Sequence, residues 1–169
     1  NRYIRVRSFK QEGLSSAEKI LRPGDLMTSV DLKKAYWHLK IREDLQPDMM
    51  FRVGEETFCW KSLPFGLNIA PRLFTKLAKM ALKPLRAAGL RLVSYIDDLL
   101  LMAATREVAV GQTLQILTRF QDLGLQVSWQ KCELDPSPSL KFLGFTLNSA
   151  TWCMSAPRGK WLTLWSQMD

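Results

Sequence analysis

Two adjacent carboxylates, Asp97 and Asp98, interrupt one of the most apolar stretches of the chain. The flanking runs, residues 90–95 and 99–102, are short and rich in β-favouring residues, so we expect a hairpin with an acidic tip at 96–98. Like charges beside apolar strands repel and lose hydration, so one carboxyl would bind a proton unless a cation neutralises the pair. Taken alone, an Asp-Asp pair is more typical of an ordinary turn, because Asp is a favoured turn residue.

A third carboxylate, Asp31, makes a metal-binding site a reasonable hypothesis for this pair. Asp31 lies within a predicted core strand, residues 26–32, that follows the turn signal at residues 22–25. If this strand and the hairpin are neighbours in one sheet, three carboxylates converge at one edge. Mg²⁺ suits such a site, because it takes oxygen ligands and shares substrate phosphates. Two such ions, about 3.5–4 Å apart, support the in-line displacement of nucleotide polymerisation.

The remaining patterns predict one mixed α and β domain. A hairpin is expected at residues 50–61 around Gly54-Glu55-Glu56, and strands at 125–127 and 140–147. A helix begins near Asn68 and Pro71 and is bent or stopped at Pro84. A second helix spans 108–123 and is closed by Gly124, and residues 135–139 form a turn. This order lacks the regular alternation of a parallel sheet, so we expect an α+β fold with an antiparallel sheet backed by helices.

The apolar faces of the two helices follow from helical spacing. In the first helix this face comprises Leu73, Phe74, Leu77, Met80 and Ala81. In the second it comprises Val108, Leu114, Leu117, Phe120 and Leu123.

The charge balance indicates a polyanionic partner. The 169 residues include 24 Lys and Arg against 16 Asp and Glu, for a net charge of +8. The basic residues are spread along the chain, which favours a folded groove over a disordered basic tail. The chain has no apolar run of about eighteen residues and no apolar signal segment after its basic start, so we expect an intracellular protein, cytoplasmic or nuclear, without membrane contact.

The cysteines and tryptophans carry weaker predictions. Cys59, Cys132 and Cys153 lack paired spacing and His38 is the only histidine, so buried cysteines are favoured over a zinc site. Three tryptophans, Trp37, Trp60 and Trp129, could stack on unpaired bases, but core packing is the favoured interpretation.

Four motifs in order resemble the reverse transcriptase family. Residues 95–98, Tyr-Ile-Asp-Asp, resemble its Tyr-x-Asp-Asp hairpin, and residues 31–36 resemble its first catalytic motif. Residues 63–71 are similar to the loop and helix start between those motifs, and residues 142–145 resemble the primer-grip turn. The similarity covers roughly residues 23–145. The residues around the motifs are most similar to those of retrotransposon enzymes of the DIRS group or their long-terminal-repeat relatives.

The resemblance implies a polymerase palm that copies a primed RNA or DNA template with deoxynucleoside triphosphates. It assigns Asp31, Asp97 and Asp98 to two Mg²⁺ ions, for which Mn²⁺ can substitute, with the Leu32 carbonyl as a further ligand. The matching positions imply further roles. Lys131 would act as a general acid, and Ala35 and Tyr36 would lie under the incoming sugar. Phe65 and Gly66 would contact the nucleotide, and Leu143 and Gly144 would form the primer grip. Tyr36 then excludes a 2′-hydroxyl. The purely structural alternatives are a solvent-exposed Lys131, an ordinary buried aromatic at Tyr36 and a simple turn at Phe65 and Gly66.

The resemblance also implies that parts of a larger enzyme are absent. Only the tail of the fingers, from Asn1, would be present, and residues 157–169 would begin the thumb. We therefore expect a single partial domain, 1–169, that extends primers poorly by itself. Two alternatives stay open: a domesticated palm that serves as a non-catalytic RNA-binding or protein-binding scaffold, and an RNA-copying RNA polymerase, which Tyr36 disfavours. The oligomeric state is left open.

Overall fold

The computed structural model describes residue 4 and residues 7–156, so the predicted thumb start at 157–169 lies outside the described residues. The elements, in chain order, are α1 (Leu14–Ile20), β1 (Leu26–Asp31), the 3-10 helices η1 (Ala35–His38) and η2 (Glu43–Met49), β2 (Met50–Val53), β3 (Glu56–Cys59), α2 (Ala70–Ala87), β4 (Arg91–Tyr95), β5 (Asp98–Ala103), α3 (Arg106–Asp122), the 3-10 helix η3 (Trp129–Lys131), β6 (Glu133–Ser137), β7 (Ser139–Phe142), β8 (Phe145–Asn148) and β9 (Cys153–Ser155).

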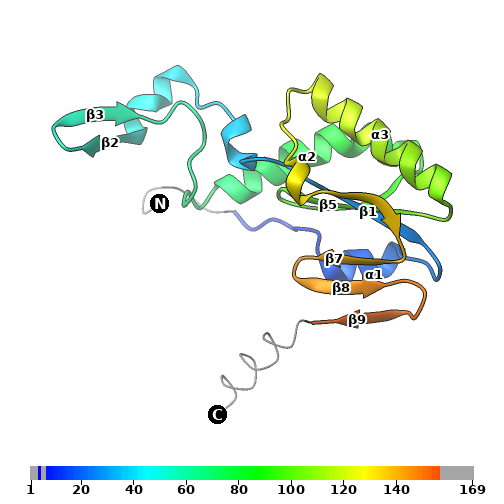
Figure 1. Ribbon diagram of the computed structural model, residues 1–169. Coiled ribbons are helices and arrows are strands. Elements are labelled where there is room, and N and C mark those ends of the chain that lie inside the picture. The colour runs from blue at the N-terminus through cyan, green and yellow to red at the C-terminus, as the bar shows by residue number, and fades with distance from the viewer. Residues whose placement is uncertain (1–3, 5–6, 157–169) are drawn as a thin grey trace, which may run out of the picture.

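A four-stranded antiparallel sheet forms the centre of the molecule. Its strand order is β4-β5-β1-β6, and β4 and β5 are the hairpin predicted from the acidic pair. Helices α2 and α3 cover one face, while α1 and the small sheet β7-β8-β9 lie on the other (Figure 1). The predicted α+β architecture is confirmed, and β1 and β5 are adjacent, as the convergence of the three acids requires.

Alternation along the strands produces two separate hydrophobic cores. Val30, Leu99 and Leu101 point to the helices and join a core with Phe74 and Ile116. The intervening side chains of these strands, such as Met27, Leu100 and Met102, belong to a second core with Leu140 and Phe142. A two-residue period on strands buried on both faces explains why the sequence is almost continuously apolar there.

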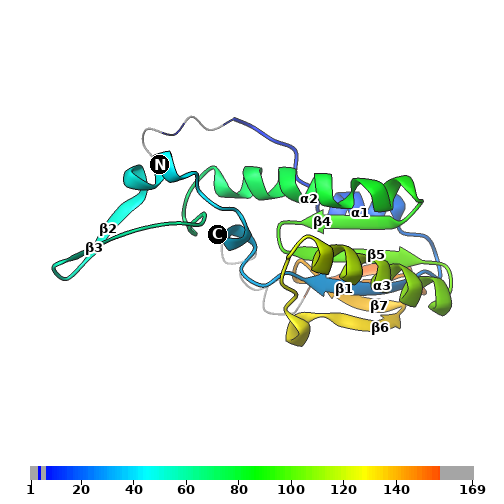
Figure 2. The same ribbon diagram turned by 90° about the horizontal axis from the view of Figure 1, so that it is seen from above.

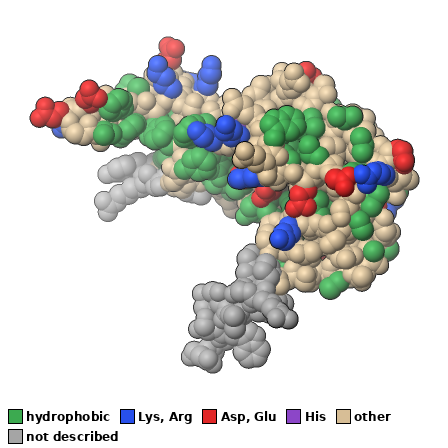
Figure 3. All heavy atoms as spheres, viewed as in Figure 1, with side chains coloured by type: hydrophobic (Ala, Val, Ile, Leu, Met, Phe, Trp, Pro, Cys, Tyr) green, Lys and Arg blue, Asp and Glu red, His purple; other side chains and the backbone are tan. Residues whose placement is uncertain are grey.

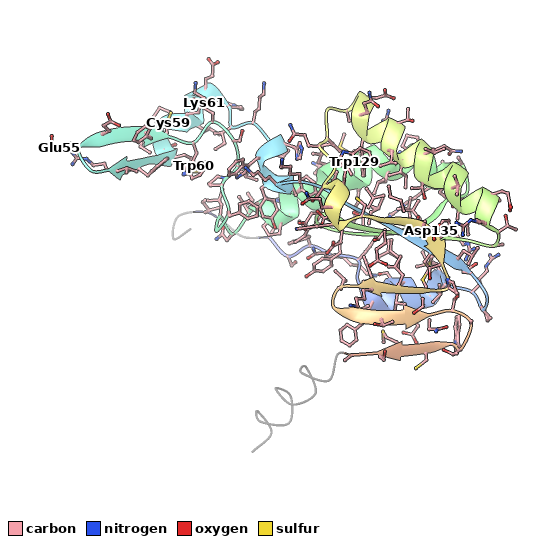
Figure 4. All side chains as sticks on the ribbon, viewed as in Figure 1. Glu55, Cys59, Trp60, Lys61, Trp129 and Asp135 are labelled. Atoms are coloured by element: carbon pink, nitrogen blue, oxygen red, sulfur yellow. The ribbon has the colours of Figure 1, made fainter. Side chains whose placement is uncertain are left out.

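The hairpin β2–β3 extends away from this body as an arm (Figure 2). It confirms the predicted turn, with Val53 opposite Glu56. All eight of its strand residues are exposed, although four of them are large and apolar: Met50, Phe51, Val53 and Phe58. Figure 3 shows this apolar surface along the arm and acidic side chains at its tip, where Glu55 lies (Figure 4).

Helix α2 differs from its prediction at its end and at one residue of its predicted face. It continues past Pro84 to Ala87, because the exposed proline lies in the last turn, where its lost N–H affects only one hydrogen bond. Of the predicted face, Phe74 and Ala81 are buried, and Leu73 and Leu77 pack partly buried against the core. The fully buried residues of the helix are Ala70, Phe74, Thr75, Ala78, Ala81 and Leu82. Met80, predicted to be packed, is 66% exposed.

Helix α3 confirms its predicted end but only part of its predicted face. Gly124 has φ +67, and Leu125 donates to the Phe120 carbonyl while Gly124 donates to that of Gln121, which is a Schellman cap. The buried residues are Ala109, Thr113, Ile116 and Phe120. Of the predicted face, Phe120 is buried and Leu117 packs partly buried against the core, whereas Val108, Leu114 and Leu123 are exposed. Thr113 meets Thr28 of β1 through a 2.8 Å hydroxyl contact, so a polar pair occupies the interface.

The region after α3 corrects three predictions. Residues 133–137 form the edge strand β6, where a turn was predicted at 135–139; an edge accepts Pro136 because one side of the strand needs no N–H donor. Residues 125–127 contribute only one bridge, between Val127 and Leu32. The predicted strand 140–147 is interrupted by a turn at Leu143-Gly144 and forms β7 and β8.

Several predictions of buried side chains are also wrong. Cys59 and Cys153 are exposed and Cys132 is partly buried. Trp37 is 42% exposed and Trp129 62%, so neither is a core residue. Figure 4 shows Trp60 on the arm and Trp129 on the helix-covered side of the sheet. Within the described residues, none of the helices combines the length and apolarity that crossing a bilayer demands.

Candidate active site

Asp31 and Asp98 lie directly opposite each other where β1 and β5 end. The two strands run in register from Leu26 and Ala103 to this pair of carboxylates. Opposed residues of an antiparallel pair have Cβ atoms about 4.5–5.5 Å apart, and like charges at such positions destabilise a sheet. The pair therefore either shares a proton or requires a cation.

Asp97 is positioned by a strained turn. Tyr95 pairs with Asp98, so Ile96 and Asp97 form a two-residue hairpin loop, and Ile96 has φ +52. A β-branched residue in this region is an outlier that costs about 1–2 kcal/mol. The Asp97 carbonyl accepts a 2.9 Å hydrogen bond from Leu32, which fastens the turn to the end of β1. Strain of this kind is typical of functional sites.

The electrostatics of the cluster reflect the close approach of its partly buried carboxylates. Burial, followed by the charges of Asp97 and Asp31, raises the pKa of Asp98 to about 6. Burial also raises the pKa of Asp31, while the cation of Lys131 opposes this shift. The Lys131 Nζ atom lies 3.8 Å from Asp31 Oδ2 but is largely exposed, so it compensates the cluster only weakly.

The backbone of Asp31 is held by two residues that the sequence prediction missed as part of the site. Its N–H donates to Cys132 Sγ at 3.3 Å, and its carbonyl accepts from the Ser128 N–H at 2.8 Å. Cys132 in turn donates to the Ser128 carbonyl. No sequence signal identifies these residues, because their contact depends on how η3 and β6 return to β1.

A buried oxygen atom of this cluster suits a hard cation. Asp31 is 8% exposed, and its Oδ1 atom is buried without a hydrogen-bond partner among the described residues. Across the same described part of the chain, no group of three or more His, Cys, Asp or Glu side chains already forms a metal cage. Mg²⁺ needs no such cage, because one or two carboxylates with waters and phosphates suffice.

A second group of predicted residues forms an aromatic wall next to the acids. Tyr36, in η1, is buried, and its ring lies 5.0 Å from that of Phe65 and 6.1 Å from that of Phe74, centroid to centroid. Burial and the neighbouring Asp97 charge raise the pKa of Tyr36, which places the phenol within electrostatic reach of the acids. Phe65 is 61% exposed, and Gly66 has φ +83 in the loop before α2. Ala35 is buried at the start of η1.

His38 has a structural role at this wall. Its Nδ1 lies 3.0 Å from the Ala35 carbonyl, and its Nε2 accepts from the Gln126 N–H at 2.9 Å. Because Nε2 accepts, the proton of the neutral ring is on Nδ1. The imidazole thus joins η1 to the segment after α3.

The predicted primer-grip residues occupy a tight turn on the other sheet. Leu143 and Gly144, with φ +50 and +76, connect Phe142 and Phe145 of β7 and β8. Positive φ at both central residues is the pattern of a type I′ hairpin turn. Leu143 packs against the second core, which contains Phe142.

Comparisons with known proteins agree with this fold. The sequence profile described as reverse transcriptase (RNA-dependent DNA polymerase) matches residues 3–147. The genome polyprotein of Petunia vein clearing virus (isolate Shepherd) is 32% identical over 126 residues, which are 75% of this chain and 6% of the polyprotein. The Transposon Tf2-7 polyprotein of Schizosaccharomyces pombe is 22% identical over 148 residues, 88% of this chain and 11% of that polyprotein.

Solved structures give the same fold. The foamy viral protease-reverse transcriptase in complex with RNA/DNA hybrid superposes with a TM-score of 0.78 at 22% identity, over 91% of this chain and 20% of that one. The native prototype foamy virus protease-reverse transcriptase has a TM-score of 0.74 at 25% identity, over 94% and 20%.

The fold is that of the palm class of nucleic-acid polymerases, here with Asp31 and Asp98 at the end of two central strands. The chain belongs to the reverse transcriptase (RNA-dependent DNA polymerase) family. It spans only a small part of the relatives that it matches.

Proposed function

We propose that this chain supplies the catalytic palm of an RNA-directed DNA polymerase. Such an enzyme would extend a primer on an RNA or DNA template with deoxynucleoside triphosphates. The observation that carries the proposal is the opposition of Asp31 and Asp98 across β1 and β5, with Asp97 in the adjoining turn. Family membership supports the same activity.

Asp31, Asp97 and Asp98 would hold two Mg²⁺ ions, or Mn²⁺ in their place, with the Leu32 carbonyl as a further ligand. When bound, such ions activate a primer hydroxyl and stabilise the leaving pyrophosphate. The protein fixes Asp31 through Cys132 and Ser128, and fixes Asp97 through Leu32. This leaves the carboxylate oxygens as the part of the site that can respond to a cation.

Lys131 is proposed to protonate the departing pyrophosphate. Its ammonium lies near Asp31 yet is largely exposed, so it can turn from the carboxylate to a phosphate oxygen. A lysine in this position acts as a general acid, and its proton passes from Nζ to the leaving group.

The aromatic wall is proposed to select and seat the nucleotide. The backbone at Ala35 and the ring of Tyr36 would lie under the incoming sugar, where the ring leaves no room for a 2′-hydroxyl. Phe65 and Gly66 would contact the base pair, and Leu143 and Gly144 would hold the primer strand. The exposed face of Phe65 beside the buried Tyr36 supports this arrangement.

Primer extension by the protein that contains this chain tests the proposal. Asp97→Asn is expected to lower the rate by roughly 100-fold or more, because it removes a transition-state charge partner. Asp122→Asn is the matched control, since Asp122 is exposed at the end of α3, and it should leave the rate unchanged. Equal rates for Asp97→Asn and the wild type would refute the proposal, and nucleic-acid binding without any extension would favour a scaffold.

A further inference from the structure

The outer face of α2 carries a continuous row of cations. Arg72, Lys76, Lys79 and Lys83 are spaced by four, three and four residues, so they follow one side of the helix over about 16 Å. This row, here called the basic stripe, faces away from the packed side, which contains Phe74 and Ala78. Figure 2 shows α2 along one edge of the molecule, beside β4.

The charge of the basic stripe is uncompensated. Helix α2 contains no Asp or Glu, and its remaining cation, Arg86, pairs with Glu12. Among residues 4 and 7–156, no carboxylate forms an ion pair with a member of the basic stripe. Like charges at i, i+4 spacing destabilise an isolated helix by about 0.2–0.5 kcal/mol per pair. A sequence that keeps four such charges on one face favours a polyanionic partner there.

A groove beside the basic stripe has further features of a nucleic-acid surface. It has a volume of about 250 Å³ and is lined by Phe9, Lys10, Arg72, Leu73, Thr75, Lys76 and Lys79. Phe9 is 37% exposed and offers an aromatic face. Thr75 is only 7% exposed, and its hydroxyl has no hydrogen-bond partner among the described residues. A buried, unpartnered hydroxyl among cations is suited to a phosphate or sugar oxygen.

We propose that the basic stripe and this groove bind single-stranded nucleic acid, in particular the template strand before it is copied. Cations that follow a backbone, combined with an aromatic face for a base, are the usual elements of single-strand binding. Helix α2 begins directly after the loop of Phe65 and Gly66, so the basic stripe starts close to the proposed nucleotide site. This inference rests on the proposed function, because it assigns a path to the template of that reaction.

Two variants with equal net charge test the inference. Lys76→Gln/Lys79→Gln/Lys83→Gln removes three charges from the basic stripe. Lys19→Gln/Arg22→Gln/Lys141→Gln removes three exposed charges from α1, the turn before β1, and β7. Each lowers the net charge from +8 to +5, so nonspecific attraction falls equally. A charge-preserving variant, Lys76→Arg/Lys79→Arg/Lys83→Arg, completes the set.

The measurement is the affinity for primer-template with a long single-stranded template overhang and for the same duplex with blunt ends, across a salt series. We expect the stripe variant to bind the overhang substrate about tenfold more weakly, with a salt slope smaller by about 2, since each phosphate contact on a single strand contributes about 0.7. Blunt duplex binding should change less than about twofold, and the control and arginine variants should retain overhang binding.

Equal losses in the stripe and control variants would overturn the inference, because they would indicate a bulk charge effect. So would unchanged overhang binding in the stripe variant. Failure of the wild type to bind either substrate would overturn the proposed function as well, which separates the two outcomes. The melting temperature of the stripe variant should equal or exceed that of the wild type, because the substitutions remove repulsion between like charges on α2.

Discussion

The carboxyl of Asp98 keeps its proton at pH values where an ordinary aspartate is ionised. Its pKa of about 6 exceeds the usual value of 3.8 because of burial and two neighbouring acids. The folded state therefore binds more protons than the unfolded state between these values, so the free energy of unfolding falls as pH rises through this window. The destabilisation persists at higher pH until a cation neutralises the cluster.

Asp98→Asn tests this linkage at residue scale. Without divalent metal at pH 8, we expect the variant to be more stable than the wild type by about 1–2 kcal/mol, the value of a one-unit to two-unit shift reduced for solvent screening. At pH 4 the two proteins should unfold alike. Added Mg²⁺ should raise the melting temperature of the wild type more than that of the variant, which keeps only two of the three carboxylates. Thermal unfolding from pH 4 to 8, with and without Mg²⁺, measures all three, and parallel curves would contradict the account.

Tyr36 provides the second prediction at residue scale. Tyr36→Ala removes a buried ring that contacts Phe65 and Phe74. We expect the variant to incorporate ribonucleotides at least tenfold more efficiently relative to deoxynucleotides, because a gain near 1.4 kcal/mol is one factor of ten. The kcat/KM ratio for the two nucleotide classes measures this. Tyr36→Phe keeps the ring and should keep the selectivity, and loss of selectivity in both variants would point to the hydroxyl instead.

At the scale of elements, the β4–β5 turn combines strain with function. Ile96 has φ +52 and partly packs against the first core. Ile96→Met removes the β-branch while keeping an apolar side chain, so we expect it to stabilise the fold by about 0.5–1 kcal/mol. Ile96→Val keeps the branch and loses one methylene, so it should be less stable than the wild type. Chemical denaturation of the three proteins checks this order, and a destabilised Ile96→Met variant would contradict the strain.

Local patterns predicted the elements better than the faces that they bury. The acidic hairpin, the arm hairpin and the Gly124 cap each depend on a few neighbouring residues, and all three are confirmed. The prediction for α3 missed the buried Thr113, because this residue pairs with Thr28, a partner 85 residues away. Strand β6 was missed because its Pro136 reads as a turn signal unless the strand is known to be an edge.

In the site, too, residues in local motifs could be predicted, and residues brought there by tertiary contacts could not. Asp31, Asp97 and Asp98 could be proposed from sequence, because Asp31 and the acidic hairpin both lie in short motifs that resemble those of reverse transcriptases. Asp31 and Asp98 pair across β1 and β5, so the strand adjacency on which that hypothesis depended is present. Cys132 and Ser128 could not be proposed, since only the return of the chain after α3 brings them to Asp31.

At the scale of the whole molecule, the central sheet is packed in the two cores, whereas the β2–β3 arm lies outside them. The four-stranded sheet is covered on both faces, so the two cores hold the strands that carry the acids. The strands of the exposed β2–β3 arm contribute no residue to either core. Two-stranded hairpins are marginal alone. The rigidity of the proposed metal site therefore comes from the sheet and its helices.

Binding of Mn²⁺, followed by the paramagnetic broadening of backbone amide signals, tests the central claim most directly. We predict that low Mn²⁺ concentrations broaden the amides of Asp31, Asp97 and Asp98 first, that Mg²⁺ reverses the broadening, and that the double variant Asp31→Asn/Asp98→Asn abolishes it. The Asp122→Asn control should behave as the wild type. Broadening centred elsewhere, or unchanged in the double variant, would contradict a cation site at the end of β1 and β5.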